Sequence, residues 1–574
     1  MFKAAQMLES NGRVVEKLMV DNPISLGIRA RDISVLLGLC FLIFFWKLGD
    51  IPFYDRGEPR EGLVVAEMNS SGNWILPKVN GEYIPFKPPL FHWMGVIAAN
   101  IFGGVTEFSL RFPSALLGSL GVLLTYFAGA RLWGERAGLV AGLVLASNVQ
   151  WREGASLVQV DMTLAFFMLA AFLSFLFLYR EGGGSKKKTA GLALLLAFAT
   201  LAKGPIGIVV PGLVFLVFLA IRRDFTFLKN LHPLVSGALF LLVAGSWYAL
   251  ALWQGGAAFF FRQLVDENLR TATGEYGRPQ PIYYFVPVLF YNMAPWSLFL
   301  PALAFFLYRQ RNRLKEDEFL YPLIWLAVVF VFFSISSGKR GIYILSLYPA
   351  AALLWGAWWV HVEKGDSQSQ GLTLLIGYFV ATAYLLIVGA FFARIFGWDI
   401  FKHFGGGENF SFVLRALFAP SRLVLALLLL SSIAILSLFW ALNRRMWNWI
   451  FASLAVLAIV NLFFVKRVYY PSIAGERTLK PFIEQAKQQV DPTIPVLFYR
   501  AFDTGAIFYA GRHIPSYEEH ANEIKPPFYL LMWEEEWAPL SGKKGLEVLS
   551  IGQGTGPAHR HRMILVRANE KVEP

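Results

Sequence analysis

The sequence has few charged residues and a single cysteine. Of its 574 residues, 16% are charged and 56% are hydrophobic, whereas soluble domains contain roughly 25% charged residues. The mean hydropathy is +0.50. This composition excludes an ordinary soluble enzyme and indicates a membrane protein. Cys40 lies inside an apolar run, so neither a disulfide framework nor a multi-thiolate metal site can form.

The excess of basic residues does not require an acidic partner. Lys and Arg number 52 against 39 Asp and Glu, which gives a formal net charge of +13. In a chain with many membrane spans, Lys and Arg gather in the cytoplasmic connections and set the orientation. We therefore expect the charge to record membrane topology, and we expect no nucleic-acid partner.

Thirteen apolar stretches approach the roughly 20 residues that cross about 30 Å of hydrocarbon. They lie near residues 33–49, 112–130, 137–150, 158–179, 189–202, 206–221, 232–254, 284–308, 319–337, 342–360, 371–394, 421–442 and 446–465. No small-residue cleavage site follows the first stretch, so we expect an uncleaved first span. The pattern predicts a mainly α-helical polytopic membrane protein.

The distribution of basic residues predicts the orientation of these spans. With a cytoplasmic N-terminus, the cytoplasmic connections hold 16 Lys and Arg residues, and the short outer connections hold 4. Short connections rich in Lys and Arg stay in the cytoplasm. We therefore expect the N-terminus to be cytoplasmic and the C-terminus to lie outside.

Long polar segments gather on the predicted outer face, at residues 50–111, 255–283 and 395–420. We assign these loops to a transmembrane domain of residues 1–465, followed by a small soluble α/β domain of residues 466–574. The predicted elements of that second domain are a helix at 476–490 and strands at 496–499, 528–533, 546–551 and 563–566.

A glycine-rich motif in this second domain resembles a weak nucleotide-binding signal. Gly552-x-Gly554-x-Gly556 precedes an apolar run that reads as a strand, whereas a phosphate-binding loop opens a helix. We therefore predict a turn at these glycines and no phosphate site.

Ionisable side chains stand at the outer ends of several predicted spans. Asp161 begins the fourth span and Lys203 ends the fifth; Lys339, Arg340 and Tyr343 bracket the turn between the ninth and tenth. A single lysine at a helix end usually extends to the interface. Several ionisable groups at membrane depth instead indicate a functional site. Together they predict a cavity with both carboxylates and cations.

Such a cavity suits a lipid phosphate that leaves during group transfer. Lys87, Arg60, Lys203 or Lys339 would neutralise the phosphate, and a carboxylate would accept a proton from an attacking hydroxyl group. The sequence has no Walker or Rossmann motif before a suitable helix, and soluble nucleotide donors would lie on the other side of the membrane. We therefore expect a lipid-linked sugar as the donor.

Several short motifs, taken in order, resemble one family. They are Gly57-Glu58-Pro59-Arg60, Gly72-Asn73-Trp74-Ile75-Leu76-Pro77, Lys87-Pro88-Pro89-Leu90-Phe91-His92-Trp93, Arg111-Phe112-Pro113-Ser114, Asp161-Met162, Lys203-Gly204-Pro205, Pro295-Trp296 and Lys339-x-x-x-Tyr343. Their order resembles the bacterial polytopic glycosyltransferases of the GT-C class, specifically the lipid A aminoarabinose transferase and protein O-mannosyltransferase-like group. The resemblance covers about residues 33–360. It implies a GT-C fold with about thirteen membrane helices, an outward-facing site and C-terminal domain, and an undecaprenyl-phosphate sugar donor.

The resemblance also assigns roles, with some departures. The family motif opens with Asp-Glu, and its Asp is the usual catalytic group. Here Gly57 stands at that position, so the resemblance implies either Asp55 or Glu58 as the catalytic carboxylate. Lys87 matches the family lysine that contacts the donor phosphate, but Phe86 replaces a Glu that often precedes it.

A second departure concerns metal binding. Glu267-Asn268-x-Arg270 resembles a family Glu-His motif with Asn in place of His. This change puts the family's metal site in doubt. We predict no metal and no cofactor, with a divalent metal as the alternative, and we keep Glu267 and Arg270 as acceptor-site or loop candidates.

The sequence as a whole predicts an inverting glycosyltransferase of the bacterial inner membrane. It would move a sugar from a polyprenyl-phosphate donor to lipid A, or to a related lipopolysaccharide component, on the periplasmic face. The alternatives are a protein O-glycosyltransferase with the same donor class, a lipid flippase or transporter, and an assembly scaffold. The candidate catalytic residues are Asp55, Glu58 and Asp161, and the candidate phosphate-binding residues are Arg60, Lys87, Lys203, Lys339, Arg340 and Tyr343.

Overall fold

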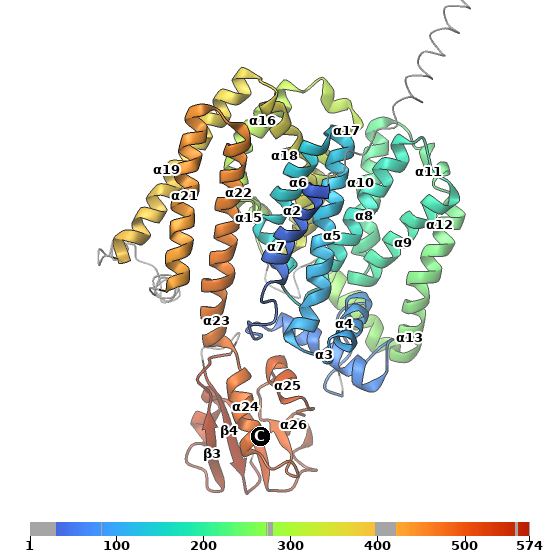
Figure 1. Ribbon diagram of the computed structural model, residues 1–574. Coiled ribbons are helices and arrows are strands. Elements are labelled where there is room, and N and C mark those ends of the chain that lie inside the picture. Colours follow the sequence, from blue (N-terminus) through green and yellow to red (C-terminus); the bar gives the residue numbers. More distant parts are fainter. Residues whose placement is uncertain are drawn as a thin grey trace, which may run out of the picture.

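The computed structural model describes residues 30–81, 83–270, 273, 279–395, 421–556 and 561–572. These residues form a bundle of helices with a small sheet-containing domain at one end (Figure 1). The long helices are α5 (Glu107–Trp133), α8 (Val160–Arg180), α9 (Lys186–Lys203), α10 (Ile206–Arg222), α17 (Asp317–Ile335), α18 (Tyr348–Glu363), α19 (Ser367–Ile395), α21 (Arg422–Arg444) and α22 (Trp447–Phe464).

Shorter helices and helical turns complete the bundle. They are α2 (Ala30–Cys40), η1 (Phe41–Phe45), α3 (Gly57–Ser71), α4 (Leu90–Ile101), α6 (Glu135–Ala146), α7 (Val149–Gly154), α11 (Phe227–Asn230), α12 (Pro233–Phe240), η2 (Leu241–Gly245), α13 (Ser246–Phe259), η3 (Phe260–Arg270), η4 (Ile282–Tyr284), α15 (Phe285–Asn292), η5 (Trp296–Phe299), α16 (Leu300–Arg309), η6 (Arg313–Lys315), η7 (Gly341–Leu347) and η9 (Val465–Tyr469).

Every one of the thirteen predicted spans overlaps a helix. Within the described residues, eight helical stretches are long and apolar enough to cross a membrane, and a bent pair makes a ninth. The four other predicted spans fall on α2 with η1, α6, α9 and α10. The predicted fold class, a mainly α-helical polytopic membrane protein, is confirmed. The predicted outer segment at residues 395–420 lies almost entirely outside the described residues.

The predicted span at 284–308 is not one straight helix. The helical segments Ile282–Asn292 and Trp296–Arg309 meet at 105°. Pro295 lies between them, and because proline lacks the amide hydrogen that a helix interior uses, a helix ends or bends at such a position. The single span expected from hydropathy is therefore two short helices.

Small residues let the central helices approach closely. A Cβ atom on Gly138 of α6 would lie 2.4 Å from the carbonyl oxygen of Tyr126 in α5, and one on Gly356 of α18 would lie 2.4 Å from that of Ala137. Backbones pack this tightly only where side chains are small, as is common between membrane helices. The helices α5, α6 and α18 thus form a dense centre for the bundle.

The C-terminal domain is built on a four-stranded sheet of order β1-β2-β4-β3. Its strands are β1 (Val496–Phe498), β2 (Phe528–Trp533), β3 (Leu546–Ile551) and β4 (Met563–Ala568), and its helices are α23 (Tyr470–Arg477), α24 (Lys480–Gln489), α25 (Thr504–Ala510), α26 (Tyr517–His520), α27 (Glu534–Trp537) and η10 (Ala538–Leu540). β1 runs parallel to β2, and the other two pairings are antiparallel. All four predicted strands are present; β1 is one residue shorter than predicted and β4 is two residues longer.

Both faces of the central strand β2 are covered. Leu531 packs in the cluster that holds Phe482 of α24, whereas Leu530 packs in the cluster on the opposite face. Side chains alternate between faces along a strand, so a continuous apolar run marks a strand buried on both sides. Gly552, Gly554 and Gly556 lie in the connection between the antiparallel strands β3 and β4. The turn expected there stays a prediction, because part of this connection lies outside the described residues.

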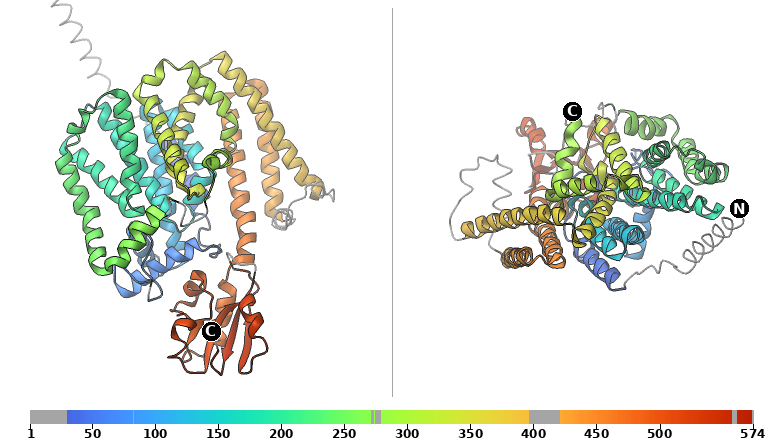
Figure 2. Two further views of the ribbon diagram at one scale, coloured as in Figure 1. Left: turned by 180° about the vertical axis from the view of Figure 1, so that it is seen from behind. Right: turned by 90° about the horizontal axis from the view of Figure 1, so that it is seen from above.

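The C-terminal domain is attached to the loops at one end of the bundle, beside α3 and α4 (Figures 1 and 2). The amide of Asn80 exchanges hydrogen bonds of 3.1 and 2.9 Å with the backbone of Ile514. Lys480 donates to Glu107 at the start of α5 over 2.7 Å. These contacts hold the loop that follows α3 and the start of α5 against the C-terminal domain.

Candidate functional site

A polar cavity of about 540 Å³ opens where α3, α7, the start of α8, the end of α9 and η7 meet. Its charged lining residues come from segments far apart in the chain: Arg60, Glu61, Lys87, Glu153, Asp161, Lys203, Glu267 and Arg340. Six of these eight residues, all except Glu61 and Glu153, were named as site candidates from the sequence. The cavity is therefore the place where the predicted ionisable groups can meet.

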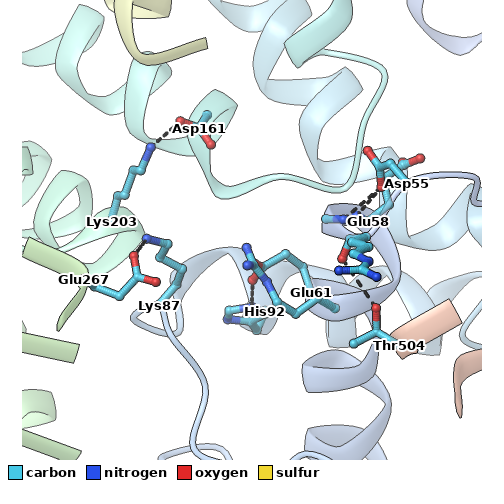
Figure 3. Close-up of polar contacts among 12 residues, drawn as sticks. Asp55, Glu58, Glu61, Lys87, His92, Asp161, Lys203, Glu267 and Thr504 are labelled. Carbon is cyan, nitrogen blue, oxygen red and sulfur yellow. Dashed lines mark hydrogen bonds and ion pairs between the residues drawn. The ribbon is translucent and has the colours of Figure 1, made fainter. Parts of the chain in front are cut away.

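Two ion pairs cross this cavity (Figure 3). Lys87 pairs with Glu267, and Lys203 pairs with Asp161. The four side chains keep between 12% and 20% of their surface exposed, so each pair is only partly buried and faces the cavity. The Lys203 ammonium also lies 4.3 Å from the centre of the Tyr343 ring, a favourable cation–π arrangement.

The local chain holds Lys87 in place. Gln263 of η3 donates to the carbonyl oxygens of Pro85 and Lys87 over 2.8 and 3.1 Å. Glu267, the partner of Lys87, lies four residues beyond Gln263 in the same helical segment, and residues at this spacing share a face of a helix. The segment η3 thus positions both the backbone and the ammonium of Lys87.

Arg60 is held by Glu61, which in turn contacts the buried side chain of His92. The Arg60 guanidinium donates to Oε1 of Glu61 over 2.7 and 3.0 Å, and Oε2 of Glu61 lies 2.8 Å from Nε2 of His92. Burial alone would raise the pKa of the Glu61 carboxyl group, but Arg60 and His92 hold that pKa well below its usual value. Glu61 is therefore an anion that orients Arg60.

Asp55 does not itself line the polar cavity, but it accepts a hydrogen bond from a residue that does. Its Oδ1 accepts hydrogen bonds from the backbone amides of Gly57 and Glu58 at the start of α3, over 3.0 and 2.9 Å. Gly57 lines the cavity, and a Cβ atom there would lie 3.8 Å from Oδ1 of Asp55. Burial and the nearby Glu58 raise the pKa of Asp55 to about 6, a value suited to proton transfer near neutral pH.

Glu58 has a different environment. Its side chain is fully buried, and both carboxylate oxygens accept from the Arg111 guanidinium over 2.7 and 2.8 Å. The amide of Val158 donates to the same carboxylate over 3.0 Å. Glu58 does not line the polar cavity. Its contacts are those of a residue that holds three chain segments together.

The remaining predicted residues divide into two groups. Arg340 and Tyr343 line the cavity, as expected. Lys339 is 7% exposed and donates to the carbonyl oxygen of Gln280 over 2.8 Å, and it does not line the cavity. Arg270 is exposed and pairs with Asp266 over 2.9 Å, also outside the cavity.

A second, mainly apolar cavity of about 430 Å³ adjoins the polar one. Five residues line both: Phe86, Lys87, Lys203, Glu267 and Tyr343. Beyond them the apolar cavity is lined by hydrophobic side chains such as Ile206, Val209, Phe333 and Ile335. The two ion pairs therefore stand at the boundary between a polar and an apolar chamber, an arrangement that fits an amphipathic molecule.

Comparison with known proteins identifies the relatives of this chain. The family model described as dolichyl-phosphate-mannose-protein mannosyltransferase matches residues 86–248. An uncharacterised protein of Aquifex aeolicus (strain VF5) is 31% identical over 331 residues, which cover 57% of this chain and 73% of that protein. The crystal structure of ArnT from Cupriavidus metallidurans bound to undecaprenyl phosphate has a TM-score of 0.76 at 21% identity, and the match covers 96% of this chain and all of ArnT.

The chain belongs to the GT-C class of polytopic membrane glycosyltransferases. An undecaprenyl phosphate-alpha-4-amino-4-deoxy-L-arabinose arabinosyl transferase of Aeromonas salmonicida (strain A449) is 29% identical over 328 residues, which cover 56% of this chain and 59% of that protein. This glycosyltransferase thus matches about three-fifths of the length of such relatives. The predicted enzyme class and family are confirmed.

The glycosyltransferase has a distinct arrangement at one family position. Phe86, where the family often has Glu, lies near two guanidinium groups: that of Arg60, 5.3 Å from the ring centre, and that of Arg262, 3.7 Å from it. An aromatic ring can accept two cations on its faces. Among the described residues, no group of three or more His, Cys, Asp or Glu side chains could hold a metal ion, and the absence of a metal stays a prediction.

Sequence reasoning missed one wall of the cavity. Gln150, Glu153, Gln159 and Tyr291 all line it. Gln150 was assigned to the end of an apolar span, although the run Gln150-Trp151-Arg152-Glu153 has the polar character of a short connecting helix. Its position next to the cavity depends on packing between α7 and η7, which the sequence does not reveal.

Proposed function

We propose that this glycosyltransferase moves a sugar from undecaprenyl phosphate to lipid A or a related lipopolysaccharide component. The observation that carries this proposal is the pair of lysines, Lys87 and Lys203, at the boundary between the polar and apolar cavities. A polyprenyl chain fits the apolar cavity, the phosphate fits the lysines, and the sugar then lies in the polar cavity. The names of the aminoarabinosyl transferase relatives support this donor class.

The two lysines would bind the phosphate by exchanging their partners. In the structure, Glu267 and Asp161 form ion pairs with the two ammonium groups. An incoming phosphate offers a stronger charged acceptor, so it would draw Lys87 and Lys203 towards itself. As the bond between the anomeric carbon and the phosphate oxygen breaks, the electron pair moves to that oxygen, and the lysines stabilise the resulting charge.

We assign the proton-accepting role to Asp55. A hydroxyl oxygen of the acceptor would attack the anomeric carbon, and its proton would pass to the Asp55 carboxylate. Oδ1 of Asp55 is held by two backbone amides, which orients the carboxylate. Glu58 is less suited to this role because Arg111 and Val158 already occupy its oxygens. Attack opposite the leaving phosphate inverts the anomeric configuration.

We place this reaction at the periplasmic face of the bacterial inner membrane. The excess of Lys and Arg in alternate connections supports a cytoplasmic N-terminus and a periplasmic C-terminal domain. Helix α3, which contributes Arg60 and Glu61 to the cavity lining, lies at the end of the bundle that carries this domain (Figure 1). A periplasmic cavity would meet lipid A in the outer leaflet of the inner membrane.

Transfer by the purified full chain in lipid vesicles tests this function. We expect that a synthetic undecaprenyl phosphate sugar and lipid A yield lipid A heavier by one sugar residue, measured by mass spectrometry. A heat-inactivated sample provides the control. Transfer to a peptide but not to lipid A would support the protein O-glycosyltransferase alternative. Movement of the lipid across the vesicle membrane without any sugar transfer would contradict the proposal and favour a flippase.

A further inference from the structure

Helix α25 of the C-terminal domain packs against the loop of the membrane domain that carries Asp55. The ring centres of Phe508 and Tyr509, two neighbouring residues of α25, lie 5.0 and 6.2 Å from that of Phe53 in the loop. A Cβ atom on Gly62 of α3 would approach the Phe508 ring to 3.2 Å, so the glycine lets α25 come close to α3. The helix is therefore in direct contact with both the loop and α3.

Two hydrogen bonds from α25 reach the backbone on either side of Asp55. The hydroxyl oxygen of Tyr509 accepts from the amide of Phe53 over 2.7 Å. The hydroxyl group of Thr504, the first residue of α25, donates to the carbonyl oxygen of Arg56 over 3.4 Å (Figure 3). Asp55 thus lies between two points of the loop that one helix of the C-terminal domain holds.

The Tyr509 hydroxyl group is itself oriented by a carboxylate of the membrane domain. It donates to Oε1 of Glu107 at the start of α5 over 3.2 Å. A phenol group has one hydrogen to donate and also lone pairs that accept, so this bond leaves a lone pair for the Phe53 amide. Glu107 is 9% exposed, and Lys480 donates to the same carboxylate over 2.7 Å. The hydroxyl group therefore joins the loop to the first turn of a long membrane helix.

Contacts within the loop do not fix its place relative to the cavity. The hydrogen bonds from the amides of Gly57 and Glu58 orient the Asp55 carboxylate relative to its own backbone. The residue before Asp55, Tyr54, has its ring centre 6.1 Å from that of Tyr470 at the start of α23. The position of the loop thus depends on side chains that come from the C-terminal domain.

We propose that Tyr509 is a positioning residue for sugar transfer: its hydroxyl group, aided by that of Thr504, holds Asp55 within reach of the acceptor hydroxyl group. This inference rests on the proposed function and on the role of Asp55 in it. A misplacement of a reacting group by about 1 Å costs about 100-fold in rate. The C-terminal domain would therefore contribute to catalysis without contacting the substrate.

The variant Tyr509→Phe tests this role because it removes the hydroxyl group and keeps the ring against Phe53. It leaves a partly buried amide without its acceptor, so we expect kcat for sugar transfer to fall about 10-fold. KM for the undecaprenyl phosphate sugar should stay unchanged, because Lys87 and Lys203 belong to other segments. Thr504→Val removes the longer hydrogen bond and should cause a smaller loss of the same kind.

Two further measurements separate positioning from a general loss of stability. Burial raises the pKa of Asp55 most, Glu58 raises it further and Arg111 lowers it. A loosened loop admits water, so in Tyr509→Phe the pKa of Asp55 should fall towards its ordinary value. The acid limb of the kcat/KM profile should then move to lower pH. Hydrogen–deuterium exchange of a peptide that covers residues 50–58 should become faster in the folded variant.

Tyr529→Phe is the matched control. The Tyr529 hydroxyl oxygen accepts from the backbone amide of Asp491 over 3.3 Å, so it makes the same kind of hydrogen bond within the C-terminal domain. This variant should retain the kcat, the pH profile and the exchange rate of wild type.

The outcomes separate this inference from the proposed function. If Tyr509→Phe keeps the kcat, the pH profile and the exchange rate of wild type, or if Tyr529→Phe loses as much activity, the positioning role is wrong and the proposed function stands. If the wild type transfers no sugar, the proposed function fails and this inference fails with it.

Discussion

Two regions of the molecule use ion pairs for opposite purposes. The pair between Glu58 and Arg111 is almost completely buried, with 0% and 2% of the side chains exposed, and Arg111 also donates to the carbonyl oxygens of Leu48 and Ile51 over 3.0 and 2.7 Å. The pairs formed by Lys87 and Lys203 face a cavity and keep part of their surface exposed. The Glu58 and Arg111 side chains are bound to each other and to other buried groups of the protein, so this pair stabilises the fold. The others have partners that a ligand can replace.

The largest expected effect breaks the buried pair. Arg111→Ala leaves the Glu58 carboxylate buried without its cation, which should lower the free energy of unfolding by about 3–5 kcal/mol. Chemical unfolding of the detergent-solubilised protein measures this loss. The double variant Glu58→Gln/Arg111→Met removes both charges and should recover part of the stability. If Arg111→Ala unfolds like wild type, the structural role of this pair is wrong.

The next largest effect tests the ion pair of Lys87 and Glu267 through the rate of sugar transfer. Lys87→Ala should reduce kcat/KM for sugar transfer about 10²- to 10³-fold, because a group that stabilises the leaving phosphate is lost. The unfolding midpoint should stay close to that of wild type. Lys87→Arg keeps the charge and is expected to retain more activity than Lys87→Ala. Wild-type turnover by a folded Lys87→Ala protein would remove this lysine from the site.

Asp55 and Glu58 lie only three residues apart, but we expect only Asp55 to accept a proton in the reaction. Asp55→Asn keeps an oxygen that can accept from the amides of Gly57 and Glu58 but cannot take a proton, so kcat should fall by about 10²-fold. In wild type, the ionised form is required, and the pKa of Asp55 is raised to about 6. The rate should therefore be constant above pH 7 and decline as the pH falls below 6. A pH profile of kcat/KM that is flat between pH 5 and 7 would contradict this assignment.

The smallest effect concerns an ion pair at the domain contact. Lys480 of α24 pairs with Glu107 over 2.7 Å and is 35% exposed. Partly exposed pairs contribute little, so Lys480→Ala should lower the free energy of unfolding by no more than about 1 kcal/mol. Sugar transfer should be unchanged, as measured in the same vesicle assay. A large loss of transfer would show that docking of the C-terminal domain controls the cavity.

The sequence predicted elements that have a strong local signal. The apolar run Phe528–Trp533 is long enough for a strand and too short for a membrane helix, and the apolar spans were recognisable by length alone. The bend also had a local signal, which is Pro295 itself. The span was predicted from the hydropathy of the whole stretch, and a single proline hardly changes that value. Asp161 and Lys203 were found because each is an isolated charge at a span end.

The pairings within the site could not be predicted in this way. Glu267 lies 180 residues from Lys87 in the chain, and their contact depends on how η3 folds back against the loop before α4. Lys339 carried the same sequence signal as Lys203, yet its ammonium is bound to a backbone carbonyl group. The direction in which a side chain points at the end of a span depends on how the helices pack. It cannot be predicted from the residue type or from the hydropathy.

A structure of the full chain with bound decaprenyl phosphate tests the central claim most directly. We predict a phosphate oxygen within about 3 Å of Nζ of Lys87, with Glu267 displaced and the prenyl chain in the apolar cavity beside Ile206 and Phe333. The contradicting result is an intact pair of Lys87 and Glu267 with the lipid bound elsewhere, for example in the apolar cavity of about 300 Å³ lined by Tyr384 and Phe464.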